Sequence, residues 1–193
     1  MPNWCNNKMT ITGPHKIIDK IEKIVKDESN DAQGLLDYFH PMPKALTDTT
    51  SPDSSADKPQ PYVDGHSNWY DWCVNKWGTK WELCEFYGHG RTTSKTRDES
   101  TITFGFSSAW APPINALSHF LEQNENCEGT LLYFEGGVDF MGKWDNFDDT
   151  ELTPSDYKSD DEFWQDGIGK EIDDEFGILE SLAEFEADQL EEA

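Results

Sequence analysis

The sequence predicts an α+β fold: a ferredoxin-like βαββαβ sandwich in which helices cover one face of an antiparallel sheet and leave the other face partly open. Three observations predict it. Segments with alternating apolar residues indicate strands, segments with apolar residues at helical spacing indicate helices, and their order along the chain contains the βαββαβ plan. The folded domain should span residues 1–144, followed by an acidic, partly helical C-terminal extension over residues 145–193.

The first strand and the first helix have clear patterns. In residues 8–12, Met9 and Ile11 alternate with polar residues, which is typical of a half-buried strand. Pro14 suits the first turn of a helix, which should end near Lys26. This helix would turn five apolar residues toward the sheet, namely Ile17, Ile18, Ile21, Ile24 and Val25.

An insertion separates this helix from the second strand. Residues 47–66 are dominated by Ser, Thr, Asp and Pro, and this composition predicts a mobile loop. Asn68, with Asp71 three residues later, resembles a helix cap, and Gly78 suits a helix end. A short helix is therefore predicted over residues 69–77.

The second half of the domain supplies the remaining strands. Residues 101–106 alternate apolar and small or polar side chains and should pair antiparallel with a strand over residues 81–87. Pro112 opens another helix with an apolar stripe. Residues 130–144 then read as a hairpin that turns at the Gly136–Gly137 pair and adds a C-terminal strand to the sheet.

The charge balance is strongly negative. The chain has 15 basic and 39 acidic residues, a formal net charge of -24, and 19 of the acidic residues lie in residues 145–193 beside only two lysines. Lys and Arg side chains drive binding to a phosphate backbone, so this balance argues against direct nucleic-acid binding by the extension and favours a basic protein partner. No apolar run could cross a bilayer and no signal peptide is recognisable, so we expect a cytoplasmic protein without a membrane partner.

The sequence shows no convincing catalytic constellation. No histidine has a nucleophilic residue at a spacing typical of a catalytic motif. The four cysteines are scattered without a CxxC pair, which indicates free thiols rather than a disulfide framework. We therefore predict no catalytic residue, no metal and no cofactor. The pattern leaves the oligomeric state open.

Residues 68–81 contain four tryptophans and a tyrosine. Such a dense cluster at helical spacing favours core packing, with Trp4 and Trp110 completing that core. The alternative is a pocket in which rings stack on a base or nucleotide while lysines hold its phosphate, in an enzyme or receptor that also uses the open sheet face. The residues of this alternative pocket are Trp69, Tyr70, Trp72, Lys76, Trp77, Lys80 and Trp81.

Three separated motifs, MPNWCNN at the start, WCVNKWGTKW over residues 72–81 and AWAPP over residues 109–113, resemble the YubB-type ferredoxin-like family of phage and conjugative-plasmid proteins. The resemblance covers about residues 1–144 and implies the ferredoxin-like fold and a mobile-element origin. Related sequences more often read TAWSPP in the third motif, and Ser108 and Ala111 occupy the varied positions here. The family is largely uncharacterised, so the resemblance carries over no catalytic residue, and the extension lies outside it.

The extension has the charge density of a nucleic-acid strand. If residues 172–192 are helical, they span about 31 Å and carry nine carboxylates, one per roughly 3.5 Å, close to the spacing of about 3.4 Å along one DNA strand. An apolar stripe on the same segment exceeds what a purely solubilising, disordered tail needs. We expect an acidic amphipathic helix there.

The leading hypothesis is a non-enzymatic phage or plasmid accessory protein that binds and inhibits a host defence or repair protein. It would present an acidic, DNA-mimicking surface to the basic groove of that host protein. The predicted contacts are Asp160, Asp161, Glu162, Asp173, Asp174, Glu175, Glu180, Glu184 and Glu186, with Phe163, Trp164, Phe176 and Leu182 as apolar anchors. In a third possibility, the extension folds back on a basic loop that contains Arg91, Lys95 and Arg97 and regulates access.

Overall fold

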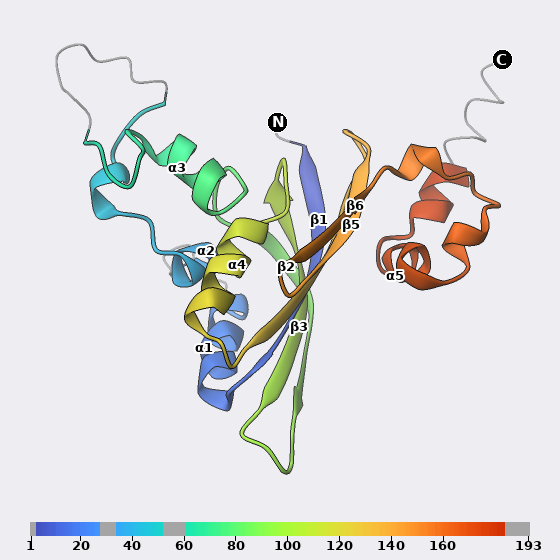
Figure 1. Cartoon of the computed structure of the whole chain (residues 1–193), viewed down its shortest axis with the longest axis horizontal. Helices are drawn as coiled ribbons and strands as arrows, with labels where there is room; N and C mark the ends of the chain where they lie inside the picture. The colour runs from blue at the N-terminus through green and yellow to red at the C-terminus, as the bar shows by residue number, and fades with distance from the viewer. Residues whose placement is uncertain (1–2, 28–33, 52–60, 184–193) are drawn as a thin grey trace.

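The computed structural model describes residues 3–27, 34–51 and 61–183. These residues form a mixed α+β fold around an open six-stranded antiparallel sheet with the strand order β2-β3-β1-β4-β5-β6 (Figure 1). The strands are β1 (Trp4–Gly13), β2 (Cys84–Thr93), β3 (Ser100–Ala109), β4 (Glu128–Glu135), β5 (Phe140–Asp145) and β6 (Asp148–Leu152).

Helices lie on both faces of this sheet. In Figure 1, α1 to α4 lie on one face and α5 lies on the opposite face. The helices are α1 (His15–Val25), α2 (Leu35–Phe39), α3 (Trp69–Lys76), α4 (Ile114–Gln123) and α5 (Gly167–Phe176), and three short 3-10 turns are η1 (Lys44–Leu46), η2 (Pro154–Asp156) and η3 (Glu162–Trp164). None of these described helices is long and apolar enough to span a membrane.

β1 is a central strand that pairs with β3 on one side and β4 on the other. Met9 and Ile11 alternate as predicted and are fully buried beneath the helices. The strand begins at Trp4, earlier than the alternation predicted, because Asn7 takes an inward position without being apolar. Its amide donates to the Ser108 hydroxyl over 2.8 Å, so the polar side chain is satisfied inside the core.

The predicted helix cap, one predicted helix start and the predicted hairpin turn are confirmed. The Asn68 side chain accepts a hydrogen bond of 2.9 Å from the Asp71 backbone N–H, and α3 follows it directly. α4 begins after Pro113, and the β4–β5 hairpin turns through Gly136 and Gly137. Of the loop predicted over residues 47–66, residues 52–60 lie outside the described residues.

β2 differs from its prediction. It begins at Cys84 rather than Trp81 and continues to Thr93 through a segment predicted to be a polar connection. Its pairing with β3 shifts register between Cys84 and Gly90, and Glu85 has a positive φ of 54°. Such irregularities interrupt the alternation of side chains between the two faces, so the sequence pattern does not reveal the full strand.

β6 was not predicted, because residues 148–152 have almost no apolar alternation. The strand pairs with β5 across a two-residue turn in which Asn146 and Phe147 have positive φ values of 43° and 78°. Positive φ at both central residues is the geometry that joins twisted antiparallel strands tightly. The first part of the extension is therefore the edge strand of the sheet, and the chain leaves the sheet only after β6.

The extension then covers part of the face predicted to be open. Met141 on β5 forms a second buried cluster with Trp164, Ile172 and Ile178 of the extension. Residues of β4 pack against this cluster, including Phe134. α5 thus lies mainly on β4 and β5, and its Glu175 also reaches Lys8 on β1.

The continuous helix predicted over residues 172–192 is interrupted. α5 ends at Phe176, and the next residue, Gly177, has a left-handed backbone (φ 63°) and donates its N–H to the Asp173 carbonyl over 2.8 Å. The Asp173 side chain also accepts a hydrogen bond from the Leu179 N–H, which starts a new helical turn over residues 178–183. Residues 184–193 lie outside the described residues, so the linear charge spacing calculated for one long helix does not apply.

Candidate functional site

The tryptophan-rich stretch separates into core residues and surface residues. Trp72 and Trp77 are buried in the main core, as the first interpretation predicted, and Trp69 is half-buried. The Trp77 indole N–H donates to the His40 carbonyl over 2.8 Å, which ties α3 to the end of α2. Lys76 forms an ion pair with Asp64 at 3.1 Å. Trp72 and Trp77 thus pack in the core, and the alternative nucleotide pocket stays a prediction.

The remaining residues of the stretch contribute to a cluster at one end of the sheet, which we call the aromatic corner: Trp4, Tyr70, Lys80, Trp81 and Trp110. The Trp4 and Trp81 rings lie 6.3 Å apart. The Lys80 ammonium lies 4.6 Å from the centre of the Trp81 ring and 5.7 Å from that of Tyr70. Trp4 is 39% exposed and Trp110 is 49% exposed, so the prediction that they complete the core is wrong.

The Trp110 backbone is held in an unusual conformation. Its φ of 75° falls in the left-handed region, which costs a bulky residue about 1–3 kcal/mol. Three hydrogen bonds fix the segment around it: the Trp110 N–H to the Asn3 carbonyl (3.0 Å), the Thr79 hydroxyl to the Ala109 carbonyl (2.7 Å), and the Ser108 hydroxyl to the Ala111 carbonyl (2.9 Å). The fold therefore presents this indole at the surface despite the backbone strain.

The three sequence motifs meet around this corner. The first and third motifs are joined between Asn3 and Trp110, and the second and third between Thr79 and Ala109. Gly78 permits the second contact, because a Cβ there would lie 3.1 Å from the Pro112 carbonyl oxygen and its φ is 87°. Motifs that are far apart in the sequence therefore build one local structure.

The apolar residues of the extension serve its own docking. Trp164 is 4% exposed and packs on the sheet, while Phe163, Phe176 and Leu182 pack partly buried around the same cluster. Phe163 also stacks on Tyr157 with ring centres 3.7 Å apart. These four side chains were predicted to anchor a partner, and in this structure they anchor the extension to its own sheet.

Several of the predicted contact carboxylates also have intramolecular partners. Glu175 pairs with Lys8 of β1 at 3.0 Å, and Asp174 pairs with Lys170. Asp173 caps the turn at Leu179, and Asp161 accepts a hydrogen bond of 2.8 Å from the Lys158 N–H.

Three predicted contacts are exposed and form no ion pair with another described residue: Asp160, Glu162 and Glu180. The positions of Glu184 and Glu186 lie outside those residues. Among the predicted contacts, the unpaired carboxylates therefore lie in η3, the loop before it and the turn after α5, while Asp148, Glu151 and Asp156 earlier in the extension are also exposed.

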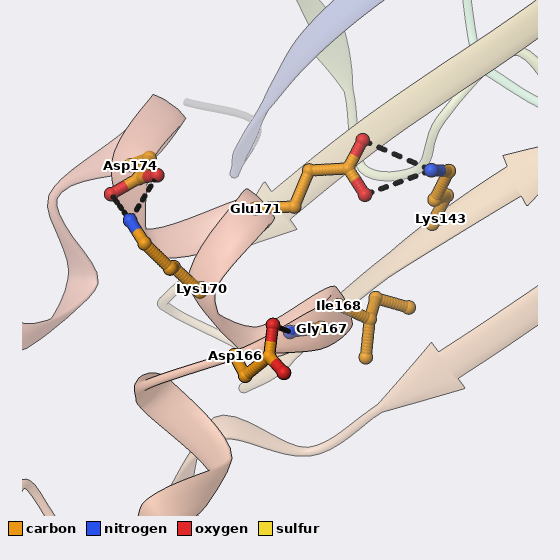
Figure 2. Close-up of a pocket in the computed structure, with 7 residues that line it drawn as sticks. All are labelled: Lys143, Asp166, Gly167, Ile168, Lys170, Glu171 and Asp174. Atoms are coloured by element: carbon orange, nitrogen blue, oxygen red, sulfur yellow. Dashed lines mark hydrogen bonds and ion pairs between the residues drawn. The ribbon is translucent and has the colours of Figure 1, made fainter.

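An open depression of about 500 Å³ lies between β5 and the start of α5 (Figure 2). Figure 2 shows that both lysines in it face carboxylates: Lys143 contacts Glu171, with the closer oxygen at 2.8 Å, and Lys170 contacts Asp174. The Asp166 carboxylate accepts a hydrogen bond of 2.7 Å from the Gly167 N–H. These cations are already neutralised, so the depression offers an anionic ligand no free positive charge.

The basic loop does not contact the described part of the extension. Arg91 pairs with Asp19 and Glu22 of α1 at 2.7 and 2.6 Å, and Arg97 pairs with Glu99 at 3.1 Å. The extension is attached instead through its apolar cluster and through ion pairs to Lys8 and Lys143. The fold-back onto the basic loop is therefore not the arrangement in this structure.

The cysteine thiols are poorly suited to nucleophilic chemistry. All four are free, and burial raises the pKa of Cys5 and of Cys73 to about 12 and that of Cys127 to about 11. A thiol with such a pKa carries almost no thiolate at neutral pH. Among the described residues, no cluster of three or more His, Cys, Asp or Glu side chains is arranged to hold a metal ion.

His40 and His119 stack between α2 and α4 with ring centres 3.7 Å apart. Burial lowers the pKa of His40, and the nearby His119 and Lys76 lower it further. Because the unfolded chain then binds the proton more tightly than the folded chain, stability is expected to fall as the pH drops below about 6.5. Thermal unfolding of His40→Phe between pH 5 and 7.5 should show a smaller loss on acidification than the wild type.

The same titration of His89→Phe controls for the loss of an imidazole, since His89 is exposed on β2. Equal slopes for the wild type and His40→Phe would contradict the expectation.

Comparisons with known proteins give little further information. No family model matches the chain, and no curated protein sequence is found to be related. Among solved structures, protein api92 from Yersinia pseudotuberculosis, whose family model is DUF1281, is similar to the chain at 11% identity and a TM-score of 0.42. The match covers 79% of this chain and 98% of that one.

Proposed function

We propose that this chain is a non-enzymatic accessory protein of a phage or conjugative plasmid that binds and inhibits a host nucleic-acid-handling protein. The binding surface is the acidic, DNA-mimicking face of the extension, and the target is a defence or repair protein with a basic groove. The observation that carries the proposal is the exposure of Asp160, Glu162 and Glu180, which form no ion pair with a described residue, on a segment fixed to the sheet.

Docking of the extension is what makes this charge useful. Residues 145–183 carry 14 carboxylates and two lysines, and the buried Trp164 and Ile172 hold their backbone in place. A partner that binds a pre-ordered array of charges does not have to order it, so less conformational entropy is lost on binding. A partner evolved to hold phosphates would bind such an array with electrostatically accelerated association.

The finer fold assignment belongs to the same proposal. The order β2-β3-β1-β4, with α1 after β1 and α4 after β3, is what a ferredoxin-like βαββαβ unit requires, and β5 and β6 extend it. The resemblance of the three motifs to the YubB-type family supports this assignment and a mobile-element origin. Such a protein would act in the cytoplasm of the bacterial host.

Neutralising the three exposed carboxylates is expected to weaken partner binding about tenfold, mainly through a slower association rate. The variant is Asp160→Asn, Glu162→Gln and Glu180→Gln. Affinity purification from a bacterial host with mass spectrometry would first identify the partner. Association rates of the purified pair would then be measured between 50 and 500 mM salt, where screening should slow the wild type steeply.

The matched control carries the same change in net charge around the end of α4 and the start of β4, at Glu122→Gln, Glu125→Gln and Glu128→Gln, which are all exposed. It should bind like the wild type. An equal loss in both triple variants, an association rate insensitive to salt, or a captured partner whose nucleic acid is not displaced would each refute the proposal.

A further inference from the structure

We propose that the aromatic corner is a docking site for an arginine- or lysine-bearing segment of a protein, separate from the acidic extension. A cationic side chain of that segment would lie over the exposed rings of Trp4 and Trp110, next to Trp81. Three features of the molecule support this site: exposed aromatic rings, a fixed backbone and a large negative net charge.

The exposure of the rings is built into the structure. Trp110 is half-exposed although its left-handed backbone disfavours a bulky side chain. Contacts from Asn3 and Thr79, which come from two other segments, hold that backbone in place. This arrangement does not stabilise the core, because the Trp110 indole lies at the surface. Exposed tryptophans on rigid supports are common anchors of protein interfaces.

Lys80 shows what kind of group these rings accept. Its ammonium lies over the Trp81 ring and near the Tyr70 ring, at the distances typical of cation–π contacts. The corner therefore already holds one cation from its own chain. Trp4 and Trp110 have no such partner among the described residues.

The net charge of the chain favours a cationic occupant. With a formal charge of -24, the molecule as a whole attracts basic segments and repels phosphate backbones. Lys80 is the lysine of the corner, and Lys76 nearby on α3 is paired with Asp64. A nucleotide would find stacking surfaces here but little positive charge for its phosphates.

NMR of the eight tryptophan indole N–H groups in the full chain would test the proposal directly. Three probes would be titrated: an eight-residue Arg-Gly repeat peptide, a matched Glu-Gly repeat, and an eight-nucleotide oligothymidylate. The Arg-Gly peptide is expected to shift the signals of Trp4, Trp81 and Trp110 more than those of Trp144 and Trp164. Signals that move only with oligothymidylate would assign the corner to nucleic acid and overturn the proposal.

Trp110→Gly is the decisive variant, because glycine accepts the positive φ and the protein should fold at least as well without the indole. It is expected to weaken binding of the Arg-Gly peptide at least fivefold. The matched control is Phe147→Gly, which removes another exposed aromatic residue with a positive φ (78°). An equal loss of affinity in Phe147→Gly would show that the peptide contacts exposed aromatic residues without preference, and no loss in either variant would show binding by charge alone; both results would refute the site.

Lys80→Gln separates a cation site from an anion site. Removing the resident ammonium should tighten binding of the Arg-Gly peptide about threefold, because the cation of the peptide then meets free rings and no repulsion. Lys95→Gln, on the exposed β2–β3 connection, makes the same change in net charge and should leave the affinity nearly unchanged. Weaker peptide binding in Lys80→Gln would contradict the proposal.

Discussion

Replacing Trp164 with alanine is expected to lower the free energy of unfolding by about 3–5 kcal/mol, the range for removing a large buried aromatic side chain. The indole is 4% exposed, donates to the Lys158 carbonyl over 2.9 Å, and contacts the rings of Tyr157 and Phe163. Its loss would leave a cavity between the extension and the sheet. Urea unfolding followed by far-UV circular dichroism measures the effect.

Tyr62→Ala is the matched control, since that ring is 77% exposed and should cost less than about 1 kcal/mol. Limited proteolysis gives a second readout: the variant should be cut within residues 153–183 well before the sheet is degraded. If both variants unfold at the same urea concentration, the apolar cluster does not hold the extension.

The second large effect is expected at Glu82, where alanine should cost about 2–4 kcal/mol. The carboxylate accepts hydrogen bonds from the backbone N–H groups of Leu36 (2.8 Å), Asp37 (3.2 Å) and Leu83 (3.1 Å), so it caps the start of α2 and fixes the approach to β2. Gly34 leaves room for it, because a Cβ there would overlap the carboxylate. Alanine would remove the acceptor for all three donors, which urea unfolding would detect.

The same carboxylate predicts a pH dependence. Burial raises the pKa of Glu82 above its ordinary value of 4.5, against the opposing effect of its hydrogen bonds. The folded state then binds this proton more tightly than the unfolded state, so stability from this group is greatest below pH 4.5 and is lost as the pH rises through the folded pKa. The stability advantage of the wild type over Glu82→Gln should therefore shrink on raising the pH. An advantage that grows would contradict the assignment.

The elements predicted most accurately are those whose apolar residues face a single layer. Ile102, Phe104 and Phe106 of β3 alternate in the sequence and are all fully buried. Ile18 and Ile21 of α1 likewise face the sheet as their spacing predicted. Local periodicity was sufficient here because these apolar side chains all lie on the side of their segment that faces the core.

Tertiary contacts decided the elements that were missed. β6 is rich in carboxylates, and its place depends on the tight turn after β5 and on the Tyr133 hydroxyl, which donates to Asp149 over 2.9 Å. Neither contact leaves a periodic pattern in the sequence. Composition correctly identified the extension as acidic, but its apolar residues pack on Phe134 and Met141, and no local signal reveals that pairing.

The candidate sites show the same division. The burial of Trp72 and Trp77 could be predicted from the sequence. Trp72 lies on the inward side of α3, and Trp77 follows the end of that helix. The exposure of Trp4 and Trp110 was not predictable, because it depends on how β1 and β3 end relative to each other. The hydrophobic character of a residue therefore predicted burial correctly for Trp72 and Trp77 and incorrectly for Trp4 and Trp110.

The central position of β1 has a consequence for synthesis of the chain on the ribosome. β1 is made first, yet its hydrogen-bonding partners are β3 and β4, and the side-chain bond from Asn7 to Ser108 spans 101 residues. At about 5–20 residues per second, β1 waits on the order of 5–20 s for its first partner strand. Throughout that interval both edges of β1 are unpaired. Of the elements that cover Met9 and Ile11 in the folded protein, only those already synthesised, such as α1, can shield them. The strand that organises the finished sheet is thus the one most dependent on protection from premature association while the chain is being made.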